Sequence, residues 1–234
     1  MPHSIDKHIN AQVTYWKKRK DQMEEVEKVN RLPFITISRE YGCGGFNVAT
    51  EIIELLNKEM NPEPKWAAYD KKILEKLMVD TGLSSSLIET LTGKARNNLT
   101  DVIQTFFNKF PPQVAIHKKV TETITMLALN GNVVIVGRGS NMITKKFKSG
   151  FHVRLVAPLD HRAENVSKIM NTGKAEAIKL INEKSKQRED YLKEFFKFDL
   201  TDPHHYDLMI NEARFTVKET AKLIIGAMKI RGLV

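Results

Sequence analysis

Cysteine is almost absent from this chain of 234 residues, which contains Cys43 alone. A single thiol cannot form an intrachain disulfide, and it cannot supply the several ligands of a Cys-based zinc site. The sequence therefore excludes a disulfide-stabilised secreted domain and a zinc finger. A lone cysteine is compatible with a reducing compartment, so we expect a cytoplasmic protein.

Long apolar runs, low-complexity segments and aromatic residues are also scarce. No apolar stretch approaches the roughly 20 residues of a membrane-spanning helix, and the first residues do not resemble a signal peptide. The 12 glycines and 8 prolines are scattered, which excludes collagen-like and disordered classes. Aromatic residues make up 8% of the chain, so the mixture of basic and aromatic side chains that binds nucleic acid is sparse.

Positive charge, by contrast, is in excess. The 37 lysines and arginines outnumber the 28 acidic residues, which gives a net charge of +9 at pH 7. This balance favours anionic partners, namely nucleotides, nucleic acid or acidic membrane surfaces, and does not choose among them. A surface that only keeps the protein soluble is the alternative.

The chain divides into a short N-terminal appendage, residues 1–31, and a main domain, residues 32–234. Val13, Trp16 and Met23 fall near helical spacing among charged residues, so we expect the appendage to form an amphipathic helix. Its apolar stripe would pack on the main domain or on a second subunit, in which case it would create a homodimer. The basic run at 17–20 is interpreted as a solvated helix face.

Strand and helix patterns alternate along the main domain. A capping box of Thr216 and Glu219 opens the last helix, which extends to about Ile230. The alternation predicts an α/β fold with a mostly parallel sheet and helices on both faces. Residues 71–130 read as mostly helical, although 84–112 give no clear pattern. Short apolar or β-branched runs predict strands at 34–38, 66–70, 133–136, 152–156 and 206–210.

A glycine cluster, Gly42-Cys43-Gly44-Gly45, separates the first strand from the first helix. The backbone N–H groups of such a turn and the positive end of the helix dipole form a site suited to phosphate. Standard motifs fit poorly, because the lysine and hydroxyl positions of a Walker loop hold Gly45 and Phe46. A dinucleotide fingerprint would need a third glycine where Asn47 stands.

An ordered set of segments resembles the cytidylate kinase-like family. The first, ITISREYGCGG at 35–45, is similar to the degenerate phosphate loop of that family. It is followed by AYDK at 68–71, VVIVGRG at 133–139 and VRLVAPLDHR at 153–162. Residues 186–188 and 202–211 resemble the lid and the last strand of the family. The resemblance spans about residues 34–230 and leaves residues 1–31 outside.

This resemblance implies the three-layer fold of P-loop nucleoside monophosphate kinases, with a helical acceptor-binding insertion in 71–130 and a lid in 174–202. It implies transfer of the ATP γ-phosphoryl group, with Mg²⁺, to a nucleoside monophosphate or a related small acceptor. Such chemistry needs cations that neutralise the transferring group. Because the Walker lysine is missing, Arg39 is its nearest substitute, although Arg39 could instead pair with a surface acid.

The other candidate residues divide by role. Arg138 would reach the acceptor phosphate and Arg188 would close over the phosphates from the lid, so that these two and Arg39 form the catalytic set. Asp70 and Lys76 would also bind the acceptor, unless Asp70 caps a helix and Lys76 is merely solvated. Glu40 would hold Mg²⁺ through water or serve as a structural acid. The donor nucleotide would be bound by Gly42, Cys43, Gly44, Gly45, Phe46, Asn47 and Arg162.

Two other functions stay open from the sequence. A catalytically degenerate nucleotide-binding or regulatory module is motivated by Gly45 and Phe46, which replace the residues that a Walker loop uses. A basic nucleic-acid-binding protein that uses the N-terminal helix ranks third, because aromatic residues are few. The identity of the acceptor does not follow from the sequence.

Overall fold

The computed structural model describes residues 12–17, 32–79, 115–196 and 199–234, with side chains at all of these except 76–79 and 115–116. Within these ranges five strands alternate with helices, as the sequence predicts. The predictions for residues 1–11, for Met23 and for 84–112 lie outside the described residues.

The five strands form one parallel sheet in the order β2-β3-β1-β4-β5. They are β1 (Phe34–Arg39), β2 (Ala67–Tyr69), β3 (Val133–Val136), β4 (Gly150–Val156) and β5 (Leu208–Asn211). All four residues of β3 are buried, which explains its uninterrupted apolar run. The sheet therefore has the layered α/β architecture that the alternating pattern predicts.

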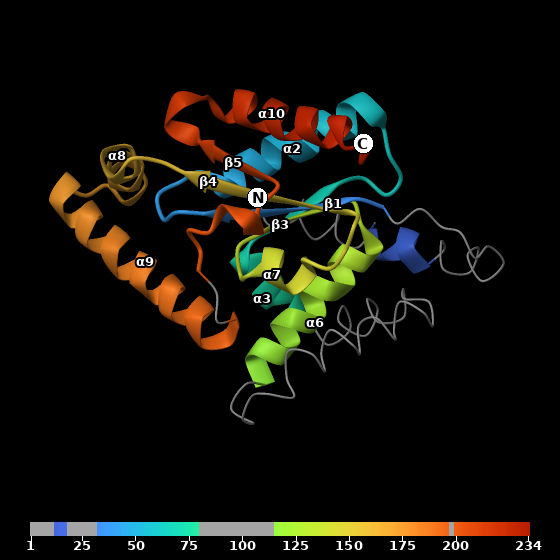
Figure 1. Cartoon of the computed structure of the whole chain (residues 1–234), viewed down its shortest axis with the longest axis horizontal. Coiled ribbons are helices and arrows are strands. Elements are labelled where there is room, and N and C mark those ends of the chain that lie inside the picture. Colours follow the sequence, from blue (N-terminus) through green and yellow to red (C-terminus); the bar gives the residue numbers. More distant parts are fainter. Residues whose placement is uncertain (1–11, 18–31, 80–114, 197–198) are drawn as a thin grey trace.

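Helices cover both faces of the sheet (Figure 1). On one face lie α2 (Gly45–Met60) and α10 (Val217–Ile230), which share a core with Ile35, Ile37 and Val134. On the other face lie α3 (Lys71–Val79), α6 (Ala115–Asn130) and the short α7 (Ser140–Thr144). The predicted capping box of Thr216 and Glu219 is present at the start of α10.

The predicted lid region, residues 174–202, consists mainly of α9 (Lys174–Phe196), which packs against α8 (Leu159–Met170). Ala163, Val166, Ala177 and Ile181 form the core between them, and Tyr41 packs against it. The far end of α9 contacts α7, because Leu192 packs with Met142. Helix α9 thus reaches from the loop that follows β1 to the turn that follows β3. Among the described helices, none is long and apolar enough to cross a membrane.

The described part of the N-terminal segment packs onto the same chain. Residues 12–17 are helical, and Val13 and Trp16 are buried in the core on the α6 side of the sheet. Gln12 Nε2 donates to the carbonyl oxygens of Lys65, at 2.7 Å, and Asn132, at 3.2 Å. Over these residues, the apolar stripe therefore packs against the main domain of the same chain. The division at residue 31 and a homodimer formed through this helix stay predictions.

The parallel register brings two glycine turns to the same edge of the sheet. Ile37 of β1 pairs with Val136 of β3, so the loops that follow these strands leave the sheet side by side. The N–H of Gly137 donates to the carbonyl of Ile37 at 3.0 Å, which ties the two loops together. This carboxyl-terminal edge is where open α/β sheets bind ligands.

Candidate phosphate-binding site

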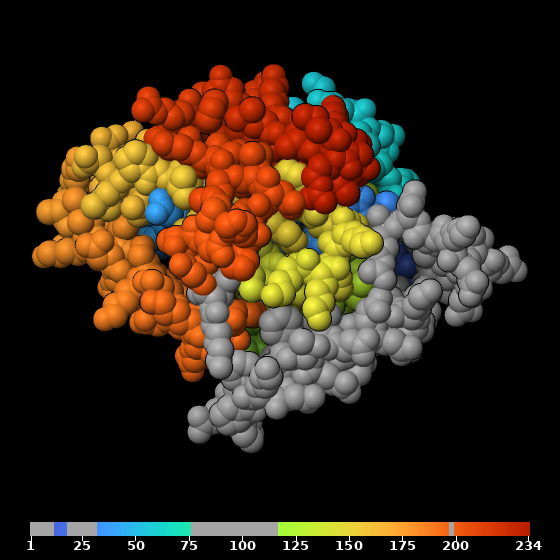
Figure 2. Space-filling model, viewed as in Figure 1, coloured from blue at the N-terminus to red at the C-terminus, as the bar shows by residue number. Residues whose placement is uncertain are grey.

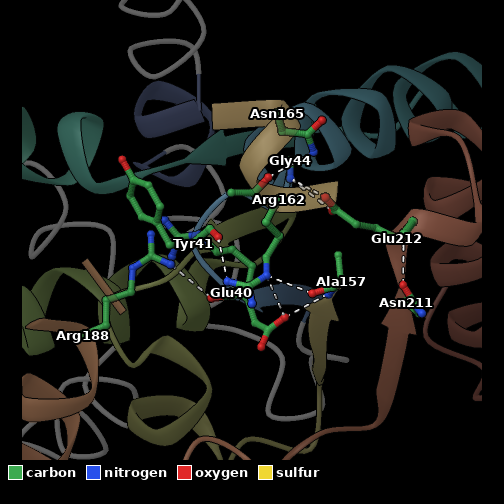
Figure 3. Close-up of polar contacts among 12 residues, drawn as sticks. Glu40, Tyr41, Gly44, Ala157, Arg162, Asn165, Arg188, Asn211 and Glu212 are labelled. Atoms are coloured by element: carbon green, nitrogen blue, oxygen red, sulfur yellow. Dashed lines mark hydrogen bonds and ion pairs between the residues drawn. The ribbon is translucent and has the colours of Figure 1, made fainter. Parts of the chain in front are cut away.

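The loop between β1 and α2 is fixed by contacts from α8 (Figure 3). Gly42 has a φ of +97°, and a Cβ there would lie 2.7 Å from the Cβ of Arg162, so the position requires glycine. Arg162 Nη1 donates to the carbonyl of Tyr41 at 3.3 Å, and Asn165 Nδ2 donates to that of Gly42 at 3.2 Å. The loop therefore has one defined shape.

Glu40 and Arg162 hold the ends of β1 and β4 together. One Glu40 carboxylate oxygen accepts a hydrogen bond from the N–H of Ala157 at 2.9 Å and lies 3.4 Å from Arg162 Nε. Arg162 Nε also donates to the carbonyl of Ala157 at 2.9 Å. These contacts favour the structural role for Glu40. They also engage the Arg162 guanidinium in positioning the loop, so its contact with a nucleotide stays a prediction.

Arg39 passes beside Gly45, the position at which a Walker loop has its lysine. Its Cγ and Cδ lie 3.3 Å from where a Cβ on Gly45 would stand, so the first residue of α2 leaves room for the arginine stem. The guanidinium continues to Gly137, where a Cβ would collide with Nη1 of Arg39. The two glycines thus form a channel for this side chain, which brings a cation from the end of β1 across the loop.

Burial, together with a smaller effect of the positive charge of Arg188, lowers the pKa of Arg39 to about 9. Within the described residues no carboxylate pairs directly with Arg39, although the more distant Asp70 favours its charged form. A half-buried guanidinium without a paired carboxylate is unfavourable in the protein alone. An anion bound beside it would remove that cost.

Arg188 approaches the same loop from α9. Its Nη1 donates to the carbonyl of Arg39 at 3.2 Å, and its guanidinium lies 5.1 Å from the centroid of the Tyr41 ring. Burial lowers the pKa of Arg188, and Arg154 adds a smaller effect in the same direction. The structure therefore brings Arg39 and Arg188 together, as the sequence predicts for a site at the sheet edge.

Arg138 is presented by a turn with unusual backbone angles. It has a φ of +57° between Gly137 and Gly139, which also have positive φ. A left-handed conformation costs energy for a residue with a side chain and is concentrated at functional sites. The guanidinium pairs with Glu75 of α3, and the buried Nε atom has no hydrogen-bond partner among the described residues. Arg138 thus retains a donor for a ligand.

The acceptor candidates on the β2 side are partly accounted for by local structure. Asp70 accepts a hydrogen bond from the N–H of Ile73 at 2.9 Å, so it caps α3. A helix cap is the alternative that the sequence offers to acceptor binding by this residue. Its charge nevertheless acts on Arg39, which places it at the same edge of the sheet. Lys76 lies on α3, but its side chain is outside the part that the structure describes.

The first turn of α2 offers mainly backbone groups. The N–H groups of Gly45, Phe46 and Asn47 open the helix, where no intrahelical acceptor is available to them. The Phe46 side chain packs against the core, so only its backbone can contribute to anion binding. Asn47 is exposed, and its amide nitrogen lies 3.8 Å from where a Cβ on Gly44 would stand.

Glu212 is the residue that the sequence analysis missed. It directly follows β5 and begins a short 3-10 turn, η3 (Glu212–Arg214). Figure 3 shows its carboxylate directed at the backbone nitrogen of Gly44, which lies 2.9 Å and 3.1 Å from the two oxygens. The Cys43 thiol donates a hydrogen bond to the same carboxylate, and burial raises the pKa of that thiol. A carboxylate of the chain itself thus occupies part of the predicted phosphate loop.

A Mg²⁺ ion held by Glu40 stays a prediction. No group of three or more histidine, cysteine, aspartate or glutamate side chains among the described residues could hold a metal ion. One oxygen of the Glu40 carboxylate contacts Ala157 and Arg162, and Phe46 supplies no hydroxyl. We therefore assign no step to a metal held by this chain.

The geometry of the fold and the loop defines a class of protein. It is an α/β protein with a glycine loop between its first strand and its first helix. Three arginines lie at the same edge of the sheet, namely Arg39 of β1, Arg138 of the turn after β3 and Arg188 of α9. Atoms coloured as the segment after β1 are visible beside those of α8 and α9 in Figure 2, so this region reaches the surface. Such an arrangement suits a ligand with several phosphates.

Comparison with known proteins identifies the family. The model of the cytidylate kinase-like family matches residues 34–214, and the chain belongs to this family. A cytidylate kinase of Methanocaldococcus jannaschii is 32% identical over 128 residues, which cover 52% of this chain and 70% of the relative. The resemblance recognised in the sequence is therefore confirmed, and membership supports a nucleotide kinase function.

One solved structure supports the fold. An uncharacterized protein from Eubacterium ventriosum superposes with a TM-score of 0.57 at 16% identity, over 86% of this chain and 99% of that one. A shikimate kinase from Bacteroides thetaiotaomicron aligns over 84% of this chain and 98% of its own, at 12% identity. Its TM-score of 0.40 is too low to bear on the function.

Proposed function

We propose that this protein transfers the γ-phosphoryl group of ATP to a nucleoside monophosphate or a related small acceptor. The observation that carries the proposal is the path of Arg39, which runs between Gly45 and Gly137 in the place of a Walker lysine. The path supports a positive charge between the donor loop and the turn that carries Arg138. Family membership supports the same reaction class.

The arginines would divide the work of phosphoryl transfer. The backbone of Gly42, Gly44 and Gly45, with Asn47, would hold the donor phosphates, and Arg39 would neutralise them. Arg188 would add charge from the lid helix, and Arg138 would bind the acceptor phosphate, supported by Asp70 and Lys76. Catalysis in this class is positioning and charge neutralisation, which these cations can supply. Mg²⁺ would enter as part of the ATP chelate rather than as an ion held by Glu40.

The test is acceptor-dependent ADP release by the full chain. The protein would be incubated with ATP and Mg²⁺ and, in turn, with CMP, dCMP, UMP, AMP and GMP. We expect ADP formation with at least one acceptor and none above background without it. The Arg188→Ala variant, purified in the same way, controls for contaminating kinases and should be markedly slower.

A degenerate nucleotide-binding module is the second candidate. Two observations favour it, since the Gly44 amide is occupied by Glu212 and the loop has neither a lysine at 45 nor a hydroxyl at 46. Calorimetric binding of ATP without ADP release on any acceptor would select this alternative. Absence of ATP binding would contradict both candidates.

A further inference from the structure

The Gly44 amide has one hydrogen, and Glu212 already uses it. Both carboxylate oxygens lie within hydrogen-bond distance of this nitrogen, at the positively polarised start of α2. A phosphate oxygen bound in the loop would compete for this N–H and would meet a negative charge beside it. Carboxylate and phosphate cannot both occupy the position.

The contact is built into the fold rather than made by a loose surface acid. Glu212 is only 8% exposed, and the Cys43 thiol is a second donor to its carboxylate. The backbone around it is set locally, because the Asn211 side chain accepts from the N–H of Ala213 at 3.2 Å. The carboxylate is therefore held at the loop at a high effective concentration.

The position of Glu212 in the chain suggests how its carboxylate would be released. Glu212 lies in a three-residue turn between β5 and α10, and rotation about its side-chain bonds would carry the carboxylate away from Gly44. A ligand with many contacts could bring this about, whereas a small anion with few contacts could not. The result would be a loop that responds only to strongly bound ligands.

We infer that Glu212 is an internal competitor of the ligand phosphate, which sets how strongly an anion must bind before it occupies the loop. The inference rests on the proposed function, because it takes the loop to be the donor-phosphate site. Its consequence is that a polyphosphate, which can also contact Arg39 and Arg188, displaces the carboxylate and occupies the loop. A single inorganic phosphate, which makes fewer contacts, is kept out.

The experiment compares Glu212→Gln with the wild type in the full chain by calorimetry, using ATP and inorganic pyrophosphate as probes. Removal of a charge-assisted hydrogen bond at a helix N-terminus should tighten the binding of both probes by about 5- to 30-fold. The matched control is Glu54→Gln, which removes the same charge from an exposed position on the same helix. This control should leave both affinities unchanged.

Thermal unfolding separates competition from simple helix capping. If Glu212 competes, the Glu212→Gln variant melts at a lower temperature without ligand but binds ATP more tightly. A carboxylate that only caps α2 would lower the melting temperature with no gain in affinity, and this outcome would overturn the inference alone. If neither protein binds ATP or pyrophosphate at millimolar concentration, the proposed function fails as well.

Discussion

The substitution Arg39→Met tests whether the cation that crosses the glycine loop serves the ligand rather than the fold. Methionine keeps an apolar stem beside Gly45 and removes the charge. A pKa of about 9 in place of 12.5 corresponds to about 5 kcal/mol of unfavourable interaction. Arg39 is only half-buried, so we expect the free protein to gain about 1–3 kcal/mol of stability. The sign follows because burial and Arg188 both disfavour the charged form.

The same variant should bind ATP about 10- to 100-fold more weakly, since it loses hydrogen bonds between a charged donor and phosphate. Urea denaturation followed by circular dichroism measures the first effect, and calorimetry measures the second. Lys146→Met, at an exposed position in the loop after α7, is the control for removal of one positive charge. A variant that is less stable than the wild type and binds ATP equally well would refute the reasoning, because Arg39 would then be a structural cation.

Three further predictions address separate parts of the molecule. Arg138→Ala should raise the acceptor KM or lower kcat at least tenfold while ATP affinity changes less than about twofold, as steady-state kinetics would measure; a variant that is only less stable would support a structural role. Thr216→Ala should lower the free energy of unfolding by about 1 kcal/mol, measured in urea, without changing ATP affinity, because the capping box of α10 is lost. Burial raises the pKa of Glu212, which Cys43 and His161 also face, so the carboxylate gains a proton as the pH falls and competes less well. The ratio of wild-type to Glu212→Gln affinity for ATP should therefore rise towards one at low pH, and a ratio that stays constant as the pH falls to the ordinary glutamate pKa of 4.5 would speak against this.

The sequence predicts the elements well because their signals are local. The run Val133–Val136 is a buried strand within the same bounds, and the capping box at Thr216 needs only four consecutive residues. Helix α7 was not predicted, since its five residues are too few to show a periodic pattern. The strand order also lies beyond a local signal, because it depends on pairings such as that of Phe34 with both Val133 and Gly150.

The difference between local signals and contacts between distant residues also decides which site residues the sequence predicts. The candidates Arg39, Arg138 and Arg188 were proposed from their positions after strands or in the lid, and the structure brings them to one edge of the sheet. Glu212 was missed because its partner Gly44 is 168 positions away and no motif connects them. The available signal was a carboxylate directly after the last parallel strand, since the carboxyl ends of all strands in such a sheet lie at the edge where ligands bind.

The distribution of charge at this edge supports the prediction that α9, the predicted lid helix, is part of the site. Arg39, Arg138 and Arg188 come from β1, the turn after β3 and α9, and the charges of the last two lower the pKa of the first. The fold must hold these like charges together against their mutual repulsion. A polyanion bound among them would attract all three guanidinium groups and so offset that repulsion. Arg188 is the cation that stands on the separate pair of helices, where it donates to the carbonyl of Arg39. Binding of a phosphate chain should therefore tighten the contact of α9 with the loop, so that the ligand itself completes the site.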